Sequence, residues 1–375
     1  MTYLDYQATT PLAPEALEAM LPWLRDGHAN PHSPHREGRA AKAAVEVARD
    51  QVAKALISQA DQADAGRLFF TSGATEAANW AIQGSWRRLR GQRPRIVTIA
   101  TEHACVLDTV AALAAEGADV VVLPVDRAGI VDLDAAAAAI DERTALVAAM
   151  LVNNEIGVVQ PIEQLGRLAA RAGALLLCDA VQGWGRVPLP LQSCDLVAVS
   201  AHKVYGPKGI GALWVRHGCE PLALLHGGGQ EGGLRSGTLS PSLCAGFGTA
   251  AALLATQGNG DVEALWRIAR ERLARPEWLL NGDDTHRYHG NLNVRRAGLD
   301  VNRLMSDLRD LAFSAGSACA SGSGRPSHVL RAIGLTDAQA RTSIRIGFGR
   351  YTGEDELAAA LDRIDAAARA QRVAA

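Results

Sequence analysis

The segment at 314–328, SAGSACASGSGRPSH, places one cysteine, Cys319, in a stretch dominated by glycine and serine. Cysteine usually behaves as a small buried hydrophobe, whereas a run this rich in glycine and serine is typical of a solvated, mobile loop. A thiol on such a loop can react at more than one place. The six cysteines of the chain include no Cys-x-x-Cys pair, so neither a disulfide framework nor a zinc site is indicated, and no metal is expected.

Two further reactive side chains stand directly after short apolar runs. Lys203 follows the run LVAVS, which ends at Ser200, and His202 precedes it. Such a lysine is either a partly desolvated amine that can attack a carbonyl carbon, or a surface residue that extends into solvent. Asp179 ends the run LLLCD, with Gln182 three residues later. A carboxylate there can pair with the protonated ring nitrogen of a ligand or cap the following helix.

Other polar groups also follow expected strands. The turn at 69–79, FFTSGATEAAN, places Ala74 and Thr75 at a helix N-terminus. This terminus can bind an anion, or its own side chains can cap it. His103 and Asn154 each follow an apolar run as well, where either a ligand contact or a structural role would explain them.

Arg345 lies in TSIRIGFG, among apolar residues of a predicted strand. If it is buried, its guanidinium needs an anion, which is either a substrate carboxylate or an acidic side chain. One ligand explains the whole set of side chains. Pyridoxal phosphate requires a lysine, a carboxylate for its ring nitrogen, a flat group over the ring and an anion cup, and its amino-acid substrate requires a cation. Lys203 is the candidate lysine, Asp179 the carboxylate and His103 the flat group, and Arg345 is the cation for the substrate. The anion cup would be formed by Ala74, Thr75, Ser200 and His202.

Seven short apolar runs predict the strands that hold these side chains. They are continuous rather than alternating, as expected for strands buried on both faces. Helical patterns at 76–89 and 162–173 lie between them. This alternation predicts an α/β fold with a mostly parallel seven-stranded sheet covered by helices, and an active site beyond the carboxyl ends of the strands. The runs are 67–70, 95–100, 119–125, 144–152, 174–180, 195–200 and 211–215.

After about residue 250 the pattern changes to long helices, which are separated by the strand-like segments RYHGNLNVRR and TSIRIGFG. We therefore predict two domains, the second a smaller α+β domain that carries the cysteine loop. The predicted division is a large cofactor-binding domain at 13–250 and a small domain formed by 1–12 and 251–375.

The composition of the 375-residue chain is that of an ordinary globular protein, with 48% hydrophobic and 21% charged residues and a formal net charge of −2. This balance indicates neither nucleic acid nor an anionic membrane as a partner. No apolar run approaches the roughly 18 residues of a spanning helix, and the start, MTYLDYQATT, lacks a signal-peptide pattern. We therefore predict a cytoplasmic protein, in a reducing compartment where the thiol of Cys319 can react.

A series of motifs resembles the cysteine desulfurases of the NifS/IscS type, which are fold-type I pyridoxal-phosphate enzymes of the class V aminotransferase family. The resemblance covers the chain from residue 3 to about 350. It implies a homodimer with active sites at the subunit boundary, L-cysteine as substrate, and a sulfur acceptor such as an iron–sulfur scaffold or a thiolation enzyme. The motifs are YLDYQATT, NPHS, FTSGATEAAN, TEHACVLDT, VNNEIGVVQP, CDAVQ, SAHKVYGPKGIGAL, HGGGQEGGLRSGT, GSACAS and SIRIGFGR.

The resemblance also implies individual roles. Lys203 matches the Schiff-base lysine, Asp179 the pyridinium partner, and His103 the ring-stacking histidine that is also proposed as an acid/base. Cys319 matches the mobile catalytic cysteine, which takes the sulfur of L-cysteine as a persulfide and leaves L-alanine. The other matches are Gln182 to the residue bonding the cofactor's phenolic oxygen; Ala74, Thr75, Ser200 and His202 to phosphate-side positions; Thr238 to the residue that reaches the partner subunit's phosphate; Asn154 to a residue near cofactor and substrate; and Arg345 to the substrate-carboxylate arginine.

Three departures from the family pattern qualify these implications. Ala201 stands where relatives usually have glycine, which is tolerated unless φ is positive. Cys178 stands where relatives often have valine, and we expect a buried packing thiol. The chain stops soon after its last predicted helix, without the extension that docks an iron–sulfur scaffold in housekeeping members, which argues against that partnership.

The alternative functions are a selenocysteine lyase or an aminotransferase on the same fold, or a binding or scaffold protein with a degenerate site. A nucleotide-binding protein is disfavoured, because no strand–helix turn carries a GxGxxG or Walker A match.

Overall fold

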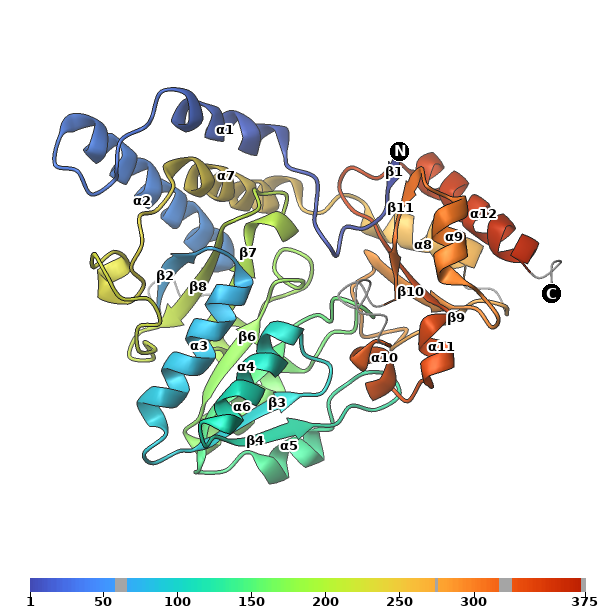
Figure 1. The fold of residues 1–375 in the computed structure, drawn as a ribbon, viewed down its shortest axis with the longest axis horizontal. Helices are drawn as coiled ribbons and strands as arrows, with labels where there is room; N and C mark the ends of the chain where they lie inside the picture. Colours follow the sequence, from blue (N-terminus) through green and yellow to red (C-terminus); the bar gives the residue numbers. More distant parts are fainter. Residues whose placement is uncertain (58–65, 274–275, 317–325, 372–375) are drawn as a thin grey trace.

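The computed structural model describes residues 1–57, 66–273, 276–316 and 326–371. Two groups of elements lie side by side, one built on a large sheet and the other on a smaller sheet (Figure 1). The chain begins in the smaller group with β1 (Thr2–Tyr3) and crosses to the larger group at α1 (Pro14–Arg25). It returns to the smaller group after α7 (Pro241–Gln257), so the N-terminal segment and the last third of the chain lie together.

The large sheet has the strand order β2–β8–β7–β6–β5–β3–β4 within the described residues. Strands β4, β3, β5, β6 and β7 pair in parallel, whereas β8 is antiparallel to both of its neighbours, β7 and β2. All seven predicted runs are strands, and the mostly parallel sheet is confirmed. Their bounds are β2 (Gly66–Thr71), β3 (Arg95–Ile99), β4 (Asp119–Leu123), β5 (Thr144–Met150), β6 (Leu175–Asp179), β7 (Leu196–Ser200) and β8 (Gly211–Arg216).

Helices cover both faces of this sheet because its strands are apolar on both faces. Neighbouring residues of β6 show this division, since Leu177 packs in one core cluster and Leu176 and Cys178 pack in the other. Cys178 is fully buried, which confirms the expected packing thiol. The first cluster includes residues of α3 (Ala74–Leu89) and α4 (Ala104–Ala115). The second includes residues of α2 (Arg36–Ile57), α5 (Leu133–Ala139), α6 (Ile162–Ala172) and α7.

The smaller group is built on an antiparallel sheet with the order β12–β13–β10–β9. The two predicted strand-like segments contain β10 and β13, whose pairing runs from Asn291 with Gly347 to Arg295 with Ser343. Strand β1 pairs in parallel with β11 beside this sheet. The predicted domain boundaries at residues 13 and 250 stay a prediction. The elements are α8 (Val262–Leu273), β9 (Leu279–Leu280), β10 (Asn291–Arg295), α9 (Val301–Asp307), β11 (Leu311–Ala312), β12 (Ser314–Ala315), α10 (His328–Ala332), α11 (Asp337–Arg341), β13 (Ser343–Gly347) and α12 (Glu354–Ala370).

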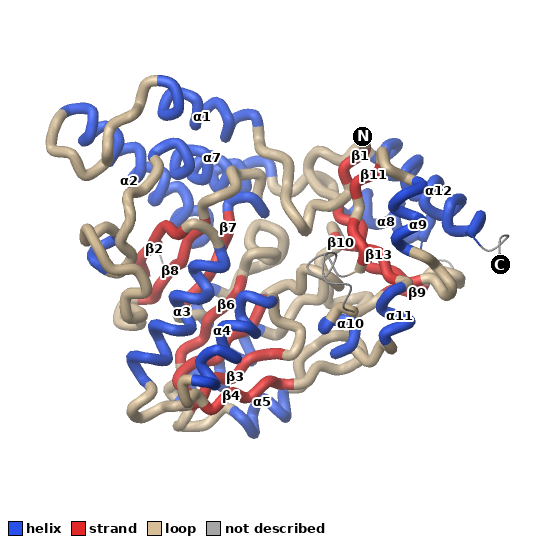
Figure 2. Tube along the Cα trace, in the orientation of Figure 1, coloured by secondary structure: helices blue, strands red, loops and turns tan. Residues whose placement is uncertain are grey.

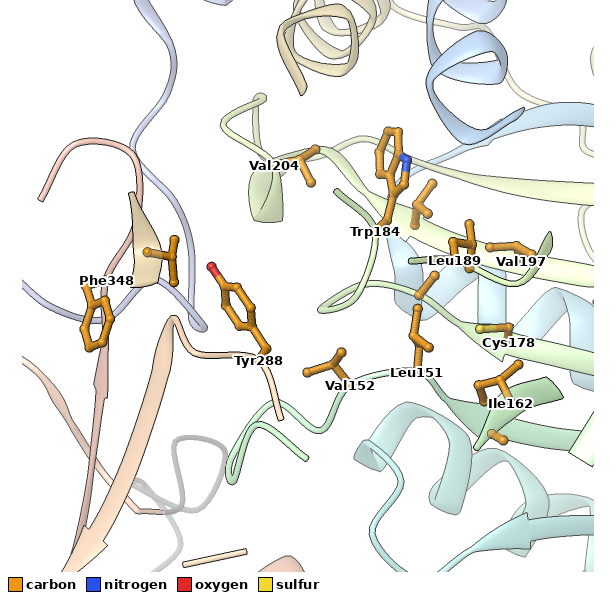
Figure 3. Close-up of a cluster of buried hydrophobic side chains, with 14 of the residues drawn as sticks. Leu151, Val152, Ile162, Cys178, Trp184, Leu189, Val197, Val204, Tyr288 and Phe348 are labelled. Carbon is orange, nitrogen blue, oxygen red and sulfur yellow. The ribbon is translucent and has the colours of Figure 1, made fainter. Parts of the chain in front are cut away.

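One hydrophobic cluster joins the two groups. Figure 3 shows Tyr288 between Phe348 of the smaller group and Leu151 and Trp184 of the larger one. This shared core fixes β13 relative to the ends of the large sheet, and loops fill the space between the two sheets (Figure 2). None of the helices that the structure describes is long and apolar enough to cross a lipid bilayer.

Candidate active site

A cavity of about 550 Å³ opens beyond the carboxyl ends of β5, β6 and β7. The last residues of these strands, Met150, Asp179 and Ser200, all line it. Because parallel strands end at one edge of the sheet, residues that are distant in sequence meet there. The predicted site residues that line this cavity are Ala74, Thr75, His103, Asn154, Asp179, Gln182, Ser200, His202, Lys203 and Arg345.

Lys203 is placed by a one-turn helix, Ala201–Lys203, that directly follows β7. Its Nζ donates hydrogen bonds to the carbonyl oxygens of Gln7, at 2.5 Å, and Ala8, at 2.8 Å. The amine is therefore held at the cavity wall by the N-terminal segment rather than extended into solvent. Ala201 lacks the positive φ that would require glycine, so this departure from the family pattern is tolerated as expected.

Asp179 and His103 form the buried polar centre of the cavity. The Oδ1 atom of Asp179 accepts a hydrogen bond from the backbone N–H of Val181 at 3.0 Å, so the carboxylate caps the following turn while it also lines the cavity. Burial raises the pKa of Asp179, whereas the Val181 N–H and the charges of His103 and Lys203 oppose that rise.

His103 is the N-cap residue of α4, and its Nδ1 accepts a hydrogen bond from the backbone N–H of Cys105 at 3.1 Å. An accepting Nδ1 carries no proton, so the proton of the neutral ring resides on Nε2. Burial lowers the pKa of His103, which also favours the neutral ring. The histidine therefore both caps a helix and presents an imidazole to the cavity.

Glu102 is a second carboxyl group near Asp179, and the sequence reasoning did not identify it. It is fully buried, and its Oε1 accepts a hydrogen bond from the backbone N–H of Met150 at 2.6 Å. Among the described atoms its Oε2 has no partner. Burial and the charge of Asp179 raise the pKa of Glu102 well above its usual range. Burial and the charge of Asp179 thus favour the neutral form of Glu102, whereas the Val181 N–H, His103 and Lys203 favour the anionic form of Asp179.

The N-terminus of α3 opens into the same cavity. Gly73 precedes the helix, and no side chain caps it, so capping by Ser72 or Thr75 does not occur. Instead, Glu76 accepts a hydrogen bond from the backbone N–H of Ser72 at 2.8 Å. An uncapped helix N-terminus with a hydroxyl group beside it suits an anion, because its first N–H groups have no partner within the helix.

His202 lines the same cavity as this terminus. Its Nδ1 is 3.2 Å from the hydroxyl oxygen of Thr9. Burial, together with the positive charges of Lys203, Lys208 and Arg186, lowers the pKa of His202 to about 4. An anion held here would meet several cationic and N–H groups, as the predicted phosphate cup requires.

Gln182 donates a hydrogen bond from Nε2 to the carbonyl oxygen of Gln7 at 2.8 Å, and its Oε1 accepts one from Arg186. With this amide the cavity holds an amine, a buried anion, a neutral imidazole and an open helix N-terminus. These groups fit pyridoxal phosphate, which needs a lysine, an anion at its ring nitrogen and a phosphate cup.

Arg345 extends from β13 and is only 1% exposed. Its Nη2 lies 2.8 Å from Oδ1 of Asp5 and 3.4 Å from Oγ of Ser314, and its Nη1 donates a hydrogen bond to the carbonyl oxygen of Asn154 at 3.0 Å. Of the two anions that the sequence allowed for Arg345, the acidic side chain is therefore present, and it is Asp5. Arg345 nevertheless lines the cavity, so a substrate carboxylate can also reach it.

Two predicted residues are not among the described residues that line the cavity. Thr238 is exposed and lies outside it. Cys319 lies outside the described residues, but the described positions on either side of its segment lie close to the cavity. Ser314 contacts Arg345, and the ring of His328 bonds through Nε2 to the carbonyl oxygen of Glu102 at 2.8 Å.

Comparisons with known proteins identify the chain. The family model of the class-V aminotransferases matches residues 2–359. Cysteine desulfurase IscS of Rickettsia bellii is 44% identical over 95% of this chain and 88% of its own length, and that of Rickettsia rickettsii is 43% identical over 96% and 90%. A solved structure of a NifS-like protein superposes with a TM-score of 0.87 at 31% identity, over 97% of this chain and 98% of that one.

A second solved structure, SspA in complex with cysteine, has a TM-score of 0.81 at 34% identity and covers 94% of this chain and all of its own. The α/β fold agrees with these solved structures. The chain therefore belongs to the class-V aminotransferase family, and within it to the pyridoxal-phosphate-dependent cysteine desulfurases.

Proposed function

We propose that Cys319 takes the sulfur of L-cysteine as a persulfide inside this cavity and passes it to an acceptor protein. The observation that supports the proposal is the position of Ser314 and His328, which lie on either side of the Cys319 segment. Ser314 contacts Arg345, which lines the cavity, and His328 bonds to Glu102, which precedes the cavity residue His103. The described residues on both sides of the thiol therefore lie beside the proposed reaction site.

Different cavity residues would bind the cofactor and transfer the proton of the substrate. Bound pyridoxal phosphate supplies an aldehyde that condenses with amines and a ring that withdraws electrons from the substrate. Lys203 would hold the aldehyde carbon, and its amine then moves the proton at the substrate's Cα. Asp179 would hold the ring nitrogen as an anion, and His103 would lie over the ring with its proton on Nε2. The uncapped N-terminus of α3, with Thr75, Ser200 and His202, would hold the phosphate.

The sulfur-transfer step requires no oxidant or reductant besides the substrate and one thiol. The thiolate of Cys319 attacks the sulfur atom of L-cysteine, so a sulfur–sulfur bond forms as the carbon–sulfur bond breaks. The electron pair of the broken bond stays on the substrate carbon, which takes up a proton and leaves as L-alanine. Arg345 would hold the substrate carboxylate through this step, because a guanidinium matches a carboxylate in a two-pronged contact.

The variant Cys319→Ser tests this assignment in the holoenzyme. We expect it to bind L-cysteine, seen as a change in cofactor absorbance, but to form no L-alanine above background, because a hydroxyl cannot accept the sulfur. Mass spectrometry of the wild-type protein should find one added sulfur atom on Cys319. The control is Cys219→Ser, since Cys219 follows β8 and does not line the cavity. Undiminished L-alanine formation by Cys319→Ser would refute the role of this thiol.

We also propose that two chains form a homodimer in which Thr238 completes the phosphate cup of the other subunit. Its support is that Thr238 is exposed and does not line the cavity of its own chain, and that its segment is firmly anchored. Glu231, in that segment, pairs with two nitrogens of Arg49 at 2.7 Å each and accepts a hydrogen bond from the backbone N–H of Phe70 at 2.9 Å.

Mixed dimers distinguish this arrangement from a role within one chain. Thr238→Ala and Lys203→Ala subunits should each bind the cofactor weakly alone. If Thr238 acts across the interface, refolding the two together yields dimers with one intact site, which pairs the Lys203 of one chain with the Thr238 of the other. If the mixture binds no cofactor tightly, or if the protein sediments as a monomer, the proposal is wrong.

A further inference from the structure

Arg345 already has a counter-ion in the structure, and this counter-ion comes from the opposite end of the chain. Asp5 follows β1, and its backbone bridges to Gly347, two residues beyond Arg345 on β13. The backbone N–H of Gly347 also donates a hydrogen bond to the carbonyl oxygen of Leu4 at 2.8 Å. The backbone pairing with β13 therefore fixes the position of Asp5. Its carboxylate lies 2.8 Å from Nη2 of Arg345 as a result.

Three of the N–H donors of Arg345 have partners in this arrangement, and two of the three are on Nη2. A guanidinium has five N–H donors, and either edge that can grip a carboxylate with two parallel hydrogen bonds includes Nη2. Nη2 is shared between Asp5 at 2.8 Å and Ser314 at 3.4 Å, while Nε has no partner among the described atoms. A second carboxylate can therefore take two bonds only by displacing one of these partners, and it then shares the guanidinium with Asp5.

Asp5 is also the acidic group that balances the charge of Arg345. Glu155 is a second carboxyl group near this guanidinium. It is almost fully buried and accepts a hydrogen bond from the hydroxyl of Ser327, and burial raises its pKa. An incoming carboxylate therefore meets an ion pair rather than an uncompensated cation.

We propose that Asp5 is an internal counter-ion that competes with the α-carboxylates of substrate and product for Arg345. This inference rests on the proposed role of Arg345 as the substrate-carboxylate residue. L-Cysteine and L-alanine carry the same α-carboxylate, so Asp5 weakens the binding of both. Its consequence for the reaction is that L-alanine leaves more readily, because Asp5 compensates Arg345 again as the product departs.

The test compares L-alanine with ethylamine, which is the same molecule without its carboxylate, as ligands of the holoenzyme. Dissociation constants are read from the change in cofactor absorbance. Asp5→Asn removes the charge but keeps an oxygen that can accept the hydrogen bond from Nη2, so the guanidinium stays oriented. We expect this variant to bind L-alanine on the order of tenfold more tightly and ethylamine with unchanged affinity.

Two further variants make the result decisive. Asp310→Asn is the control, because Asp310 adjoins the β1–β11 ladder but pairs with exposed Arg363 instead. Asp5→Ser repeats the neutral substitution if Asp5→Asn does not fold. Unchanged or weaker L-alanine binding by the neutral variants would overturn the competition and leave Asp5 as a group that only orients Arg345.

The variant Arg345→Lys separates this inference from the proposed function on which it rests. If Arg345→Lys weakens L-alanine but the neutral Asp5 variants do not tighten it, the carboxylate site stands and the competition is refuted. If Arg345→Lys leaves L-alanine binding unchanged relative to ethylamine, Arg345 does not bind the carboxylate, and both proposals are wrong.

Discussion

The variant Glu102→Gln should be more stable than the wild-type protein at neutral pH, by a margin that shrinks as the pH falls. The pKa of the native Glu102 carboxyl lies above its ordinary value of 4.5, because of burial and the charge of Asp179. Above pH 4.5 the unfolded chain therefore releases a proton that the native protein keeps. Native stability then falls by about 1.4 kcal/mol per pH unit for as long as Glu102 stays protonated.

Glutamine cannot titrate, so the variant escapes this loss. Its side-chain oxygen can still accept the hydrogen bond from the Met150 N–H, but its buried NH₂ group lacks an acceptor, which costs about 1–3 kcal/mol. The quantity that tests the prediction is therefore the change with pH in the difference between the unfolding free energies of variant and wild type. The size of that difference at one pH does not test it. Because Asp179 keeps its charge in both proteins, cofactor absorbance should be unchanged.

Urea unfolding of both holoenzymes between about pH 5 and about pH 7.5 measures the slope. Glu116→Gln is the control, because Glu116 is an exposed glutamate that pairs with Arg87. A difference in unfolding free energy that is constant across this range would mean that Glu102 is ionised in the native protein. The assignment of the single negative charge to Asp179 would then be wrong.

Three further predictions concern basic residues of the cavity. Lys203→Ala should abolish borohydride-dependent attachment of pyridoxal phosphate, detected by mass spectrometry; attachment at an unchanged level would exclude Lys203 as its site. Arg345→Ala should lower kcat/KM for L-cysteine by roughly thirtyfold to a thousandfold and also lower the melting temperature, since Asp5 loses its partner; a lower melting temperature with unchanged kcat/KM would make the pair purely structural. The pKa of His202 is lowered from 6.5 to about 4, so the cofactor-free wild type should lose stability as the pH falls through that interval, whereas His202→Gln should lose less; parallel melting curves for the two proteins would contradict this.

The strands and the polar residues at their ends could be predicted because the signal for each is local. A continuous apolar run such as LLLCD indicates a strand buried on both faces, and Asp179 at its end marks the edge of the sheet. Parallel pairing then brings Asp179 and Lys203 into one cavity without any further information.

The contacts that depend on the N-terminal segment could not be predicted in this way. Asp5 and Arg345 are 340 positions apart, and nothing in the pattern of either segment indicates their ion pair. The acceptors of Lys203 are backbone carbonyl oxygens of Gln7 and Ala8, which every residue type possesses. Glu102 was missed because a glutamate after a strand is usually solvated, and only the folded packing buries it.

These missed contacts place the N-terminal segment beside two groups that are proposed to act in the reaction. Asp5 holds the cation proposed to bind the substrate carboxylate, and two residues later the backbone of Gln7 and Ala8 holds the reactive amine of Lys203. The segment is itself fixed at both ends. Strand β1 pairs with β11 in the smaller group, and the hydroxyl of Thr10 donates a hydrogen bond to the carbonyl oxygen of His202 and accepts one from the backbone N–H of Tyr205. A displacement of the smaller sheet relative to the larger one would therefore alter the surroundings of both cations together. Residues 5–8 thus link the guanidinium proposed to bind the substrate with the amine proposed to transfer its proton.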